Sequence, residues 1–420
     1  MKSLMMKFIH GMVFAVGALF IFGGLAFVGL KVLGGANFDY YVYKVKEKVG
    51  LAKEVEPFEE PKIVLKDFTK ASRVEVSSND EFRYVSNTEE FWEALNEANQ
   101  KGNFIIYLID GVYKINKTIN IDAENITLMS LSGNPYQTVI KGTGMRGGMG
   151  NLIRVNNSHF KIDGVTLQDA SYHLVQVAGE LDVDFTVFKN IIFQDSYQQM
   201  LKVSYDINNR PQISGDYGIV ENCIFLYTDG IAPNYYTGGV DALGAKSWQV
   251  SNSIFRDIAS PKQNISQYAV HFWMNSADNI ITNNIYINND RAIGMGLGVE
   301  KSNMEYANKN GEISHNIIFH SDLSDPFADT GIAVEKSIGT KIYSNYIFLS
   351  HSYPRAIEYR FEETKEVQIS NNYTNRNVSS RDQGEALLRN NDSISLEKMT
   401  VILTERLQQL SVKNLYAKTI

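Results

Sequence analysis

One short phrase recurs from residue 190 onward in this 420-residue chain and constrains its fold more than any other feature. In each copy, an Asn is followed three positions later by Phe or Ile. Six copies are present: Asn190-Ile-Ile-Phe193, Asn222-Cys-Ile-Phe225, Asn252-Ser-Ile-Phe255, Asn284-Ile-Tyr-Ile287, Asn316-Ile-Ile-Phe319 and Asn345-Tyr-Ile-Phe348. A weaker seventh copy begins at Asn372, and successive Asn residues lie 27 to 32 positions apart. A repeat of this length predicts a solenoid of stacked coils.

The residues within each copy indicate strands rather than helices. Runs of Ile, Val, Phe and Tyr alternate with Asn, Ser, Asp and Gly, and no span is long enough for a pair of helices. An Asn in a tight turn tolerates the left-handed conformation and can bond to its copies above and below, while the apolar residue after it enters the core. We therefore predict an all-β fold, a right-handed parallel β-helix whose coils stabilise one another. A β-sandwich with coincidental Asn turns is the alternative.

Charge and cysteine content exclude some functions. The formal net charge is −7 and no stripe of basic residues is present, so we expect no nucleic-acid partner. If the substrate is an acidic polymer, basic side chains must be concentrated at one place on the surface. The single cysteine, Cys223, occupies a repeat position that should face the core, and a single cysteine permits no internal disulfide.

The N-terminal segment predicts a membrane anchor. Residues 8–33 are almost wholly apolar and long enough to span a bilayer. We expect residues 1–35 to form a single-pass anchor, with the domain that follows in the periplasm or outside the cell and the membrane as a partner. A cleaved signal peptide is the alternative, because Gly24-Leu25-Ala26 offers a small-residue cleavage site, and the protein would then be secreted.

The rest of the chain divides by composition. Residues 36–83 are predicted as a charge-rich linker, residues 84–390 as the β-helix domain and residues 391–420 as a helical cap or tail. Apolar residues at helical spacing between Leu396 and Leu410 favour a helix that closes the second end of the solenoid, although the same helix could dock a partner.

The domain opens with a distinctive order of elements. Asn87-Thr88 followed by Glu89-Glu90 predicts a capped helix to about Gln100, which would cover the first open edge of the solenoid. After it come an apolar strand that ends in Asp110-Gly-Val-Tyr113, then Thr118-Ile-Asn-Ile121 and Ile126-Thr-Leu-Met129. This order resembles the opening of the pectate-lyase-like parallel β-helix superfamily, and the resemblance extends from about Asn87 to Ser380.

The resemblance implies a fold and a broad class of chemistry. The superfamily includes polysaccharide lyases, uronate epimerases and glycoside hydrolases, so the fold alone does not select the reaction. Some of its lyases use calcium, which makes calcium a candidate cofactor, but no spacing in this sequence identifies the ligands. The Asp-Pro-His-Asp motif of alginate epimerases is absent, which disfavours an epimerase.

Counting back from each Asn locates a set of short strands with polar residues in them. The segments are Val240-Asp-Ala-Leu243, Val270-His-Phe-Trp273, Ile293-Gly-Met-Gly296, Ile332-Ala-Val-Glu335 and Ile357-Glu-Tyr-Arg360. Stacked about 4.8 Å apart, these strands would place their charged residues outward along a groove within about five rungs. We expect that groove to contain Asp241, His271, Glu335, Glu358 and Arg360.

Neighbouring residues extend this candidate site. Arg291, Arg355 and Arg360 with Lys246 form a local basic set suited to carboxylate groups. Trp273 and Tyr359 could stack on sugar rings, and Gly294 to Gly298 could form a groove floor open to a polymer. The predicted catalytic residues are His271, Arg291, Arg360, Lys246, Tyr359, Asp241, Glu335 and Glu358, and the predicted substrate-binding residues are Trp273, Arg355, Tyr353 and Asp329.

Our leading hypothesis is a lyase that cleaves an acidic, uronate-containing polysaccharide by β-elimination. Arg291 or Arg360, with Lys246, would stabilise the enolate charge, and His271 would take the proton beside the carboxylate. Tyr359 or Tyr353 would protonate the leaving oxygen. Two alternatives remain: an inverting glycoside hydrolase that uses a pair among Asp241, Glu335 and Glu358, and a membrane-tethered module that binds carbohydrate without catalysis.

Overall fold

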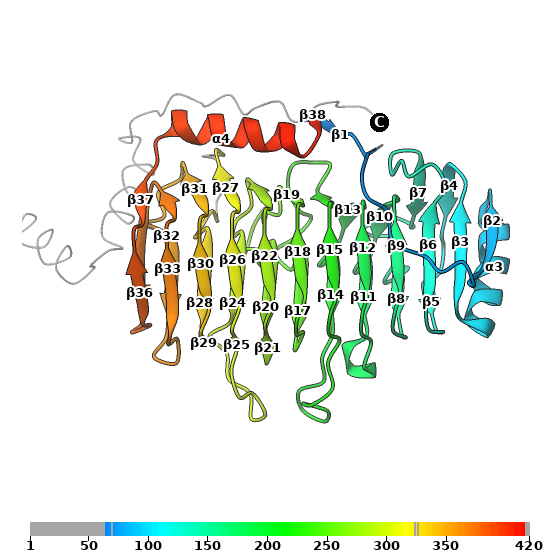
Figure 1. Ribbon diagram of the computed structural model, residues 1–420, viewed down its shortest axis with the longest axis horizontal. Coiled ribbons are helices and arrows are strands. Elements are labelled where there is room, and N and C mark those ends of the chain that lie inside the picture. Colours follow the sequence, from blue (N-terminus) through cyan, green and yellow to red (C-terminus); the bar gives the residue numbers. More distant parts are fainter. Residues whose placement is uncertain (1–63, 69, 323–324, 326, 416–420) are drawn as a thin grey trace, which may run out of the picture. The chain divides into compact units, whose positions relative to one another are not determined.

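The computed structural model describes residues 64–68, 70–322, 325 and 327–415. Three long parallel sheets run side by side along one compact unit (Figure 1). The ten-stranded sheet consists of β5 (Ile119–Ile121), β8 (Ile153–Val155), β11 (Val175–Val177), β14 (Leu201–Val203), β17 (Val240–Leu243), β20 (Val270–Trp273), β24 (Ile293–Gly296), β28 (Ile332–Glu335), β32 (Arg355–Arg360) and β35 (Asn377–Arg381).

The other two long sheets follow the same order along the solenoid. The twelve-stranded sheet consists of β2 (Glu81–Val85), β3 (Phe104–Leu108), β6 (Ile126–Ser130), β9 (Lys161–Asp163), β12 (Val187–Lys189), β15 (Ile219–Glu221), β18 (Gln249–Ser251), β22 (Ile280–Thr282), β26 (Glu312–Ser314), β30 (Lys341–Tyr343), β33 (Val367–Ser370) and β36 (Ala386–Arg389). The eleven-stranded sheet consists of β4 (Gly111–Lys114), β7 (Thr138–Lys141), β10 (Thr166–Ala170), β13 (Ile192–Ser196), β16 (Ile224–Leu226), β19 (Ile254–Arg256), β23 (Ile285–Ile287), β27 (Ile317–His320), β31 (Tyr346–Leu349), β34 (Tyr373–Thr374) and β37 (Asp392–Ser393).

The shorter elements complete the description. A three-stranded sheet contains β21 (Ser276–Ala277), β25 (Asn308–Lys309) and β29 (Ser337–Ile338), a 3-10 turn η2 spans Gly179–Leu181, and β1 (Val64–Lys66) pairs antiparallel with β38 (Val412–Leu415). Each coil contributes one strand to each long sheet in turn, so the predicted parallel β-helix is confirmed.

The predicted capping helix is also confirmed. Helix α3 spans Thr88–Lys101, and the Asn87 side chain accepts a hydrogen bond from the Glu90 backbone N–H as its N-cap. Phe91 and Leu95 on its inner face are buried against the first coil. The helix therefore covers the apolar interior at the start of the solenoid.

The predicted localisation, a membrane-anchored protein, is wrong for the described part of the chain. No helix among those residues is both long enough and apolar enough to cross a membrane, and the predicted membrane partner has no support there. Helices α3 and α4 (Leu396–Gln409) have 14 residues each, which gives about 21 Å of length against a hydrocarbon core of about 30 Å. The apolar residues 8–33, on which that prediction rested, lie outside the described residues, as do residues 36–63 of the predicted linker.

The Asn repeat changes its role along the chain. Asn190, Asn222 and Asn252 take the left-handed conformation, with φ of 57°, 59° and 52°. From Asn284 onward, the left-handed residue is the one before the Asn, and the Asn itself is buried in a ladder. Within this ladder the Asn316 backbone N–H and Nδ2 both donate to Asn345 Oδ1, each at 3.0 Å. The repeat frame therefore shifts by one residue between the third and fourth copies.

This shift decides which apolar residues enter the core. Phe193, Phe225 and Phe255 stack in the core with ring centroids 4.3 Å and 4.5 Å apart, and Tyr286 continues the stack. In the later copies, the apolar residue at the third position after the Asn lies instead on the outer face of the eleven-stranded sheet, as Phe319 does. The expectation that every copy buries this residue in the core is thus correct only for the first three copies.

Helix α4 covers that outer face. Its residues Met399, Leu403 and Leu407 are buried against Ile285 and Phe319 among others, and the helix runs along the side of the solenoid (Figure 1). The sequence favoured a helix closing the second end. The apolar outer face of the later strands provides a larger surface for its amphipathic stripe, which explains the difference.

Candidate functional site

The outer face of the ten-stranded sheet carries a line of polar side chains. In β17, Val240 and Ala242 are buried in the core, so Asp241 between them points to the outer face. The residues in register with Asp241 along the sheet are Asn120, Arg154, Gln176, Lys202, His271, Gly294, Ala333, Glu358 and Ser379. A second line, two residues further along the strands, contains Trp273, Glu335 and Arg360.

Asp241 lies at the centre of the first cluster. Its carboxylate accepts a hydrogen bond from Lys202 Nζ on one oxygen and from Trp273 Nε1, at 2.8 Å, on the other. Burial alone would raise the pKa of Asp241, but the Lys202 charge and the adjacent His271 outweigh it and hold that pKa well below its usual range. Asp241 is therefore an ionised carboxylate with a fixed ammonium partner at neutral pH.

His271 does not reach the surface. Its side chain has 0% exposure, with Trp273 stacked on one face at a centroid distance of 5.4 Å and Tyr268 tilted against it at 4.8 Å. Nε2 lies 2.9 Å from the Gly296 carbonyl, and Nδ1 lies 3.6 Å from Asp241 Oδ1. In this arrangement, the fully buried His271 ring stacks on Trp273 and lies beside Asp241.

The predicted carboxylates of the later coils are paired in a second cluster. Glu335 accepts from Arg360 Nη1 at 2.9 Å and from the Gly298 backbone N–H at 2.8 Å, and it is 3% exposed. Glu358 is 2% exposed, with Arg381 Nη1 3.7 Å from its carboxylate. These side chains point outward as expected, but they line no open groove, because their basic neighbours cover them.

The glycine segment also differs from expectation. A Cβ at Gly294 would lie 2.5 Å from the Tyr268 ring, which fills the space above this strand. Arg291 covers that ring from the other side, with its guanidinium carbon 4.2 Å from the ring centroid, and donates to the Ser266 carbonyl at 2.7 Å. The predicted floor for a polymer is therefore occupied by an aromatic ring that Arg291 holds in place.

The remaining predicted residues are spread more widely. Tyr359 alternates into the core and is 7% exposed, and Arg355 is 5% exposed at the start of β32. Lys246 follows the end of β17, and its Nζ donates to Ser214 Oγ at 3.2 Å. Asp329 accepts from the Thr330 backbone N–H at 2.7 Å. Tyr353 is half-buried in the loop between β31 and β32.

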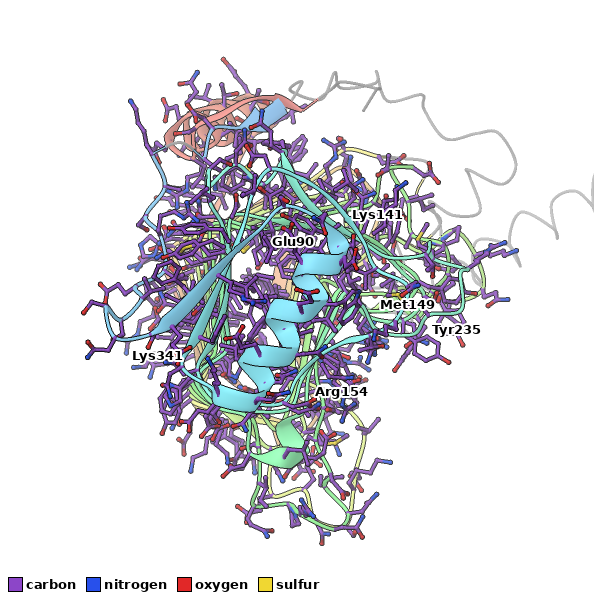
Figure 2. The ribbon with its side chains drawn as sticks, turned by 90° about the vertical axis from the view of Figure 1, so that its right-hand side faces the viewer. Glu90, Lys141, Met149, Arg154, Tyr235 and Lys341 are labelled. Atoms are coloured by element: carbon purple, nitrogen blue, oxygen red, sulfur yellow. The ribbon has the colours of Figure 1, made fainter. Side chains whose placement is uncertain are left out.

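A further set of polar side chains on the outer face lies in earlier coils than the predicted residues. Arg154, Gln176 and Lys202 are half-buried and follow one another on β8, β11 and β14. Arg154 donates to Gln176 Oε1 at 3.2 Å and pairs with Glu180 at 3.0 Å. Arg154 lies on the side of the molecule where Met149 and Tyr235 project from the connecting loops (Figure 2).

These residues escaped the sequence analysis for a local reason. Gln176 and Lys202 each sit in an apolar-polar-apolar triplet, Val175-Gln-Val177 and Leu201-Lys-Val203, of the same form as Val240-Asp-Ala242. The loop between β14 and β15 places Lys202 twenty residues before Asn222, whereas Asp241 lies only eleven residues before Asn252. The triplet could have identified Lys202 from sequence. Counting back from the Asn missed it, because the loop between β14 and β15 lengthens that interval.

His173, which is 8% exposed, lies near Lys202 and Asp241. Its Nδ1 lies 2.9 Å from the Gln199 carbonyl oxygen, an acceptor only, so the Nδ1 proton is fixed and Nε2 carries the lone pair. Burial lowers the pKa of His173 to about 4, and the charges of Lys202 and Asp241 both act on the ring. His173 is therefore a neutral imidazole at neutral pH with one nitrogen able to accept a proton.

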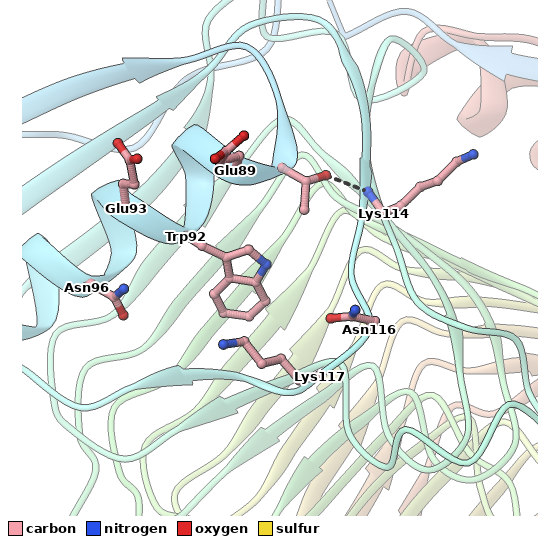
Figure 3. A pocket seen from close by; sticks show the side chains of 8 residues that line it. Glu89, Trp92, Glu93, Asn96, Lys114, Asn116 and Lys117 are labelled. Carbon is pink, nitrogen blue, oxygen red and sulfur yellow. Dashed lines mark hydrogen bonds between the residues drawn. The ribbon is translucent and has the colours of Figure 1, made fainter.

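A separate hollow lies beside the capping helix. It has a volume of about 750 Å³ and is lined by Thr88, Glu89, Trp92, Glu93, Asn96, Lys114, Asn116 and Lys117 (Figure 3). Lys117 Nζ sits 4.4 Å from the centroid of the Trp92 ring. None of the predicted site residues lines this hollow. In the described residues, no group of three or more His, Cys, Asp and Glu side chains could hold a metal ion, and no calcium ligands are assigned.

A pair of buried carboxyl groups supports the loops near Arg291. Asp290 is 1% exposed, and its Oδ2 accepts from the backbone N–H groups of Ser260 and Ser266 at 3.1 Å and 2.7 Å. Burial first, and then the charge of Asp325, raise the pKa of Asp290 to about 8. Asp325 in turn lies 3.0 Å from His320 Nε2. The pair therefore holds a proton that free carboxyl groups would have released.

We predict that this buried pair makes the free energy of unfolding depend on pH, and that Asp290→Asn removes this dependence. Between about pH 4 and pH 8, the folded state keeps the Asp290 proton while the unfolded state has lost it, so the free energy of unfolding falls as pH rises. An Asn can accept from Ser260 and Ser266 and donate to Asp325 without that cost. We expect the variant to gain roughly 1–3 kcal/mol at pH 7 over the wild type.

Urea unfolding at pH 5 and at pH 7 measures the effect of Asp290→Asn. The gain should be larger at pH 7 than at pH 5. A variant that loses stability equally at both pH values would contradict a protonated Asp290.

The comparison with solved structures agrees with this fold. An alginate lyase from Paenibacillus sp. str. FPU-7 matches with a TM-score of 0.51 at 12% identity, over 75% of this chain and 99% of that chain. This chain has the pectate-lyase-like parallel β-helix fold. PfbA, a surface adhesin of Streptococcus pneumoniae, matches with a TM-score of 0.49 at 13% identity over 73% of this chain and 87% of that one.

A polygalacturonase from Erwinia carotovora matches with a TM-score of 0.48 at 11% identity, over 77% of this chain and 96% of that chain. Identities this low establish a shared fold only. No protein-family model matches the sequence, and no curated protein matches it.

Proposed function

We propose that the protein is a polysaccharide lyase that binds a uronate-containing polymer along the outer face of the ten-stranded sheet. The observation that carries the proposal is Lys202, whose side chain is 12% exposed and is held by ionised Asp241, with the buried, neutral imidazole of His173 nearby. β-Elimination requires a fixed positive charge for the sugar carboxylate and a neutral base for the adjacent proton. Arg154, in register with Lys202 two strands away, supplies a second cation for the next sugar residue.

The proposed reaction follows from these positions. The uronate carboxylate pairs with Lys202, which stabilises the enolate charge when the adjacent C–H bond breaks. His173 Nε2 takes that proton, and the electron pair forms the new C=C bond. The glycosidic C–O bond on the neighbouring carbon then breaks, and its oxygen takes a proton from water. Asp241 holds Lys202 in place, while His271 and Trp273 keep Asp241 in place.

Product analysis tests the reaction class. We expect incubation with alginate, polygalacturonate or hyaluronan to release oligosaccharides whose new double bond absorbs in the ultraviolet. Saturated reducing ends would instead indicate a hydrolase, and binding without product would indicate a non-catalytic module. A hydrolase pairing Asp241 with Glu335 is disfavoured, because their strands are three rungs apart, about 14 Å at 4.8 Å per rung, and an inverting pair needs roughly 6.5–9.5 Å.

The acid limb of the pH profile tests the base. With a pKa of about 4, His173 is neutral and able to accept a proton at any pH above that value. We expect kcat/KM to fall only as pH drops through about 4. The test variant is His173→Asn. Its amide can still donate to the Gln199 carbonyl, but it has no counterpart of Nε2. It should lower kcat by about 100-fold or more with little change in KM, and unchanged kcat would rule out His173 as the base.

A further inference from the structure

Among the described residues, nothing covers the apolar interior at the last coil. Leu388 in β36 is in register with Ile369 in β33, and both side chains face the core. Ile369 is 0% exposed, whereas Leu388 is 42% exposed. Val378 on β35, in register with fully buried Ile357, is likewise only half-buried. None of the described helices or strands lies beyond this coil, so its core-facing residues lack the neighbour that every earlier coil has.

The Asn ladder is also unfinished at this end. The Asn372 backbone N–H and Nδ2 donate to Asn391 Oδ1 at 3.1 Å and 2.9 Å, as each earlier Asn does to the next. Among the described residues, no further Asn continues the ladder past Asn391. The same end carries the free edges of β35, β36 and β37, and half the backbone groups of such edge strands point outward. A hollow of about 640 Å³ lined by Val378, Leu388 and Ile394 among others opens here.

The opposite end is closed. Helix α3 covers the first coil with buried Phe91, Ala94 and Leu95. The helix stands where the last coil of another copy would stack on the first, which disfavours a head-to-tail filament. Two copies that instead meet through their last coils use the same surface on both, and such an interface closes as a twofold dimer.

Charge agrees with a self-complementary surface. The last coil, residues 377–394, contains two basic side chains, Arg381 and Arg389, and three acidic ones, Asp382, Glu385 and Asp392. Both signs of charge are therefore present on this surface, so two copies facing each other here could exchange ion pairs across the axis.

We propose that the last coil, residues 377–394, is the interface of a tail-to-tail homodimer. The free edges of its strands meet their counterparts in antiparallel pairing, and the two copies of Leu388 bury one another. The proposal does not depend on the enzymatic activity.

Sedimentation of the full-length chain tests the proposed dimer. At about 10 µM we expect a dimer, with Leu388→Asp weakening association by at least 10-fold. The matched control is Leu131→Asp, since Leu131 is 50% exposed in the first half of the solenoid; it should remain dimeric. A monomeric wild type, or a dimer that Leu388→Asp leaves unchanged, would overturn the proposal.

A cysteine pair gives a second readout that does not rely on the stability of Leu388→Asp. The native Cys223 is buried and should form no intermolecular disulfide under mild oxidation. Leu388→Cys, at the proposed twofold contact, should form a covalent dimer. Leu131→Cys, similarly exposed in the first half of the solenoid, should not. Equal cross-linking of the two variants, or none of Leu388→Cys, would contradict the twofold contact.

Discussion

Replacing Lys202 by Met is expected to lower kcat/KM on the cleaved polymer by about 100-fold or more. The substitution removes the charge that would stabilise the enolate while keeping the length of the side chain. It also leaves Asp241, which is 3% exposed, as a buried charge without its ammonium partner. We therefore expect a loss of roughly 3–5 kcal/mol in the free energy of unfolding as well.

The double variant separates the two effects of Lys202. Lys202→Met with Asp241→Asn removes both charges of the pair, so stability should recover most of the loss while activity stays low. Trp273 Nε1 can still donate to the Asn oxygen. Initial rates and urea midpoints of the two single variants and the double variant complete the cycle. Recovery of activity in the double variant would show that Lys202 acts only structurally.

Replacing Asn345 by Ala should cause the largest loss of stability among single changes in the ladder, about 3–5 kcal/mol. Asn345 is 0% exposed, donates to the Ile313 carbonyl at 3.0 Å and accepts from both Asn316 groups. Alanine leaves those buried partners unsatisfied, and each such group costs roughly 1–3 kcal/mol.

Asn222→Gly is the matched control for the ladder variant. Asn222 begins the same sequence phrase, but it occupies the left-handed turn position, with φ of 59°, and is half-buried. Glycine adopts that conformation readily and loses only the hydrogen bond from Asn222 Nδ2 to Asn190 Oδ1, so we expect a change of about 1 kcal/mol. Urea unfolding of both variants measures the difference. Equal losses would contradict the frame shift between the early and late copies.

The candidate site shows where prediction from sequence stops. Alternation in short strands correctly placed Asp241 and His271 on the outer face, because strand geometry is local. It could not foresee that Lys202, 39 residues earlier, would pair with Asp241, or that Tyr268 would fill the space over Gly294. Those contacts depend on how connecting loops fold back over the sheet. Exposure, and with it the accessible chemistry, is a property of the assembled coils.

The pattern of residues alone was sufficient for the architecture of this protein. Period, apolar runs, turn residues and the Asn87 cap predicted a parallel β-helix closed at its start by a helix, because each of these features acts within one coil or between adjacent ones. Only the tertiary structure decided that α4 lies along the side, that the Asn frame shifts before Asn284, and that the last coil is open. Each depends on which surfaces remain uncovered once the coils have stacked, and that is set by contacts between residues far apart in the chain.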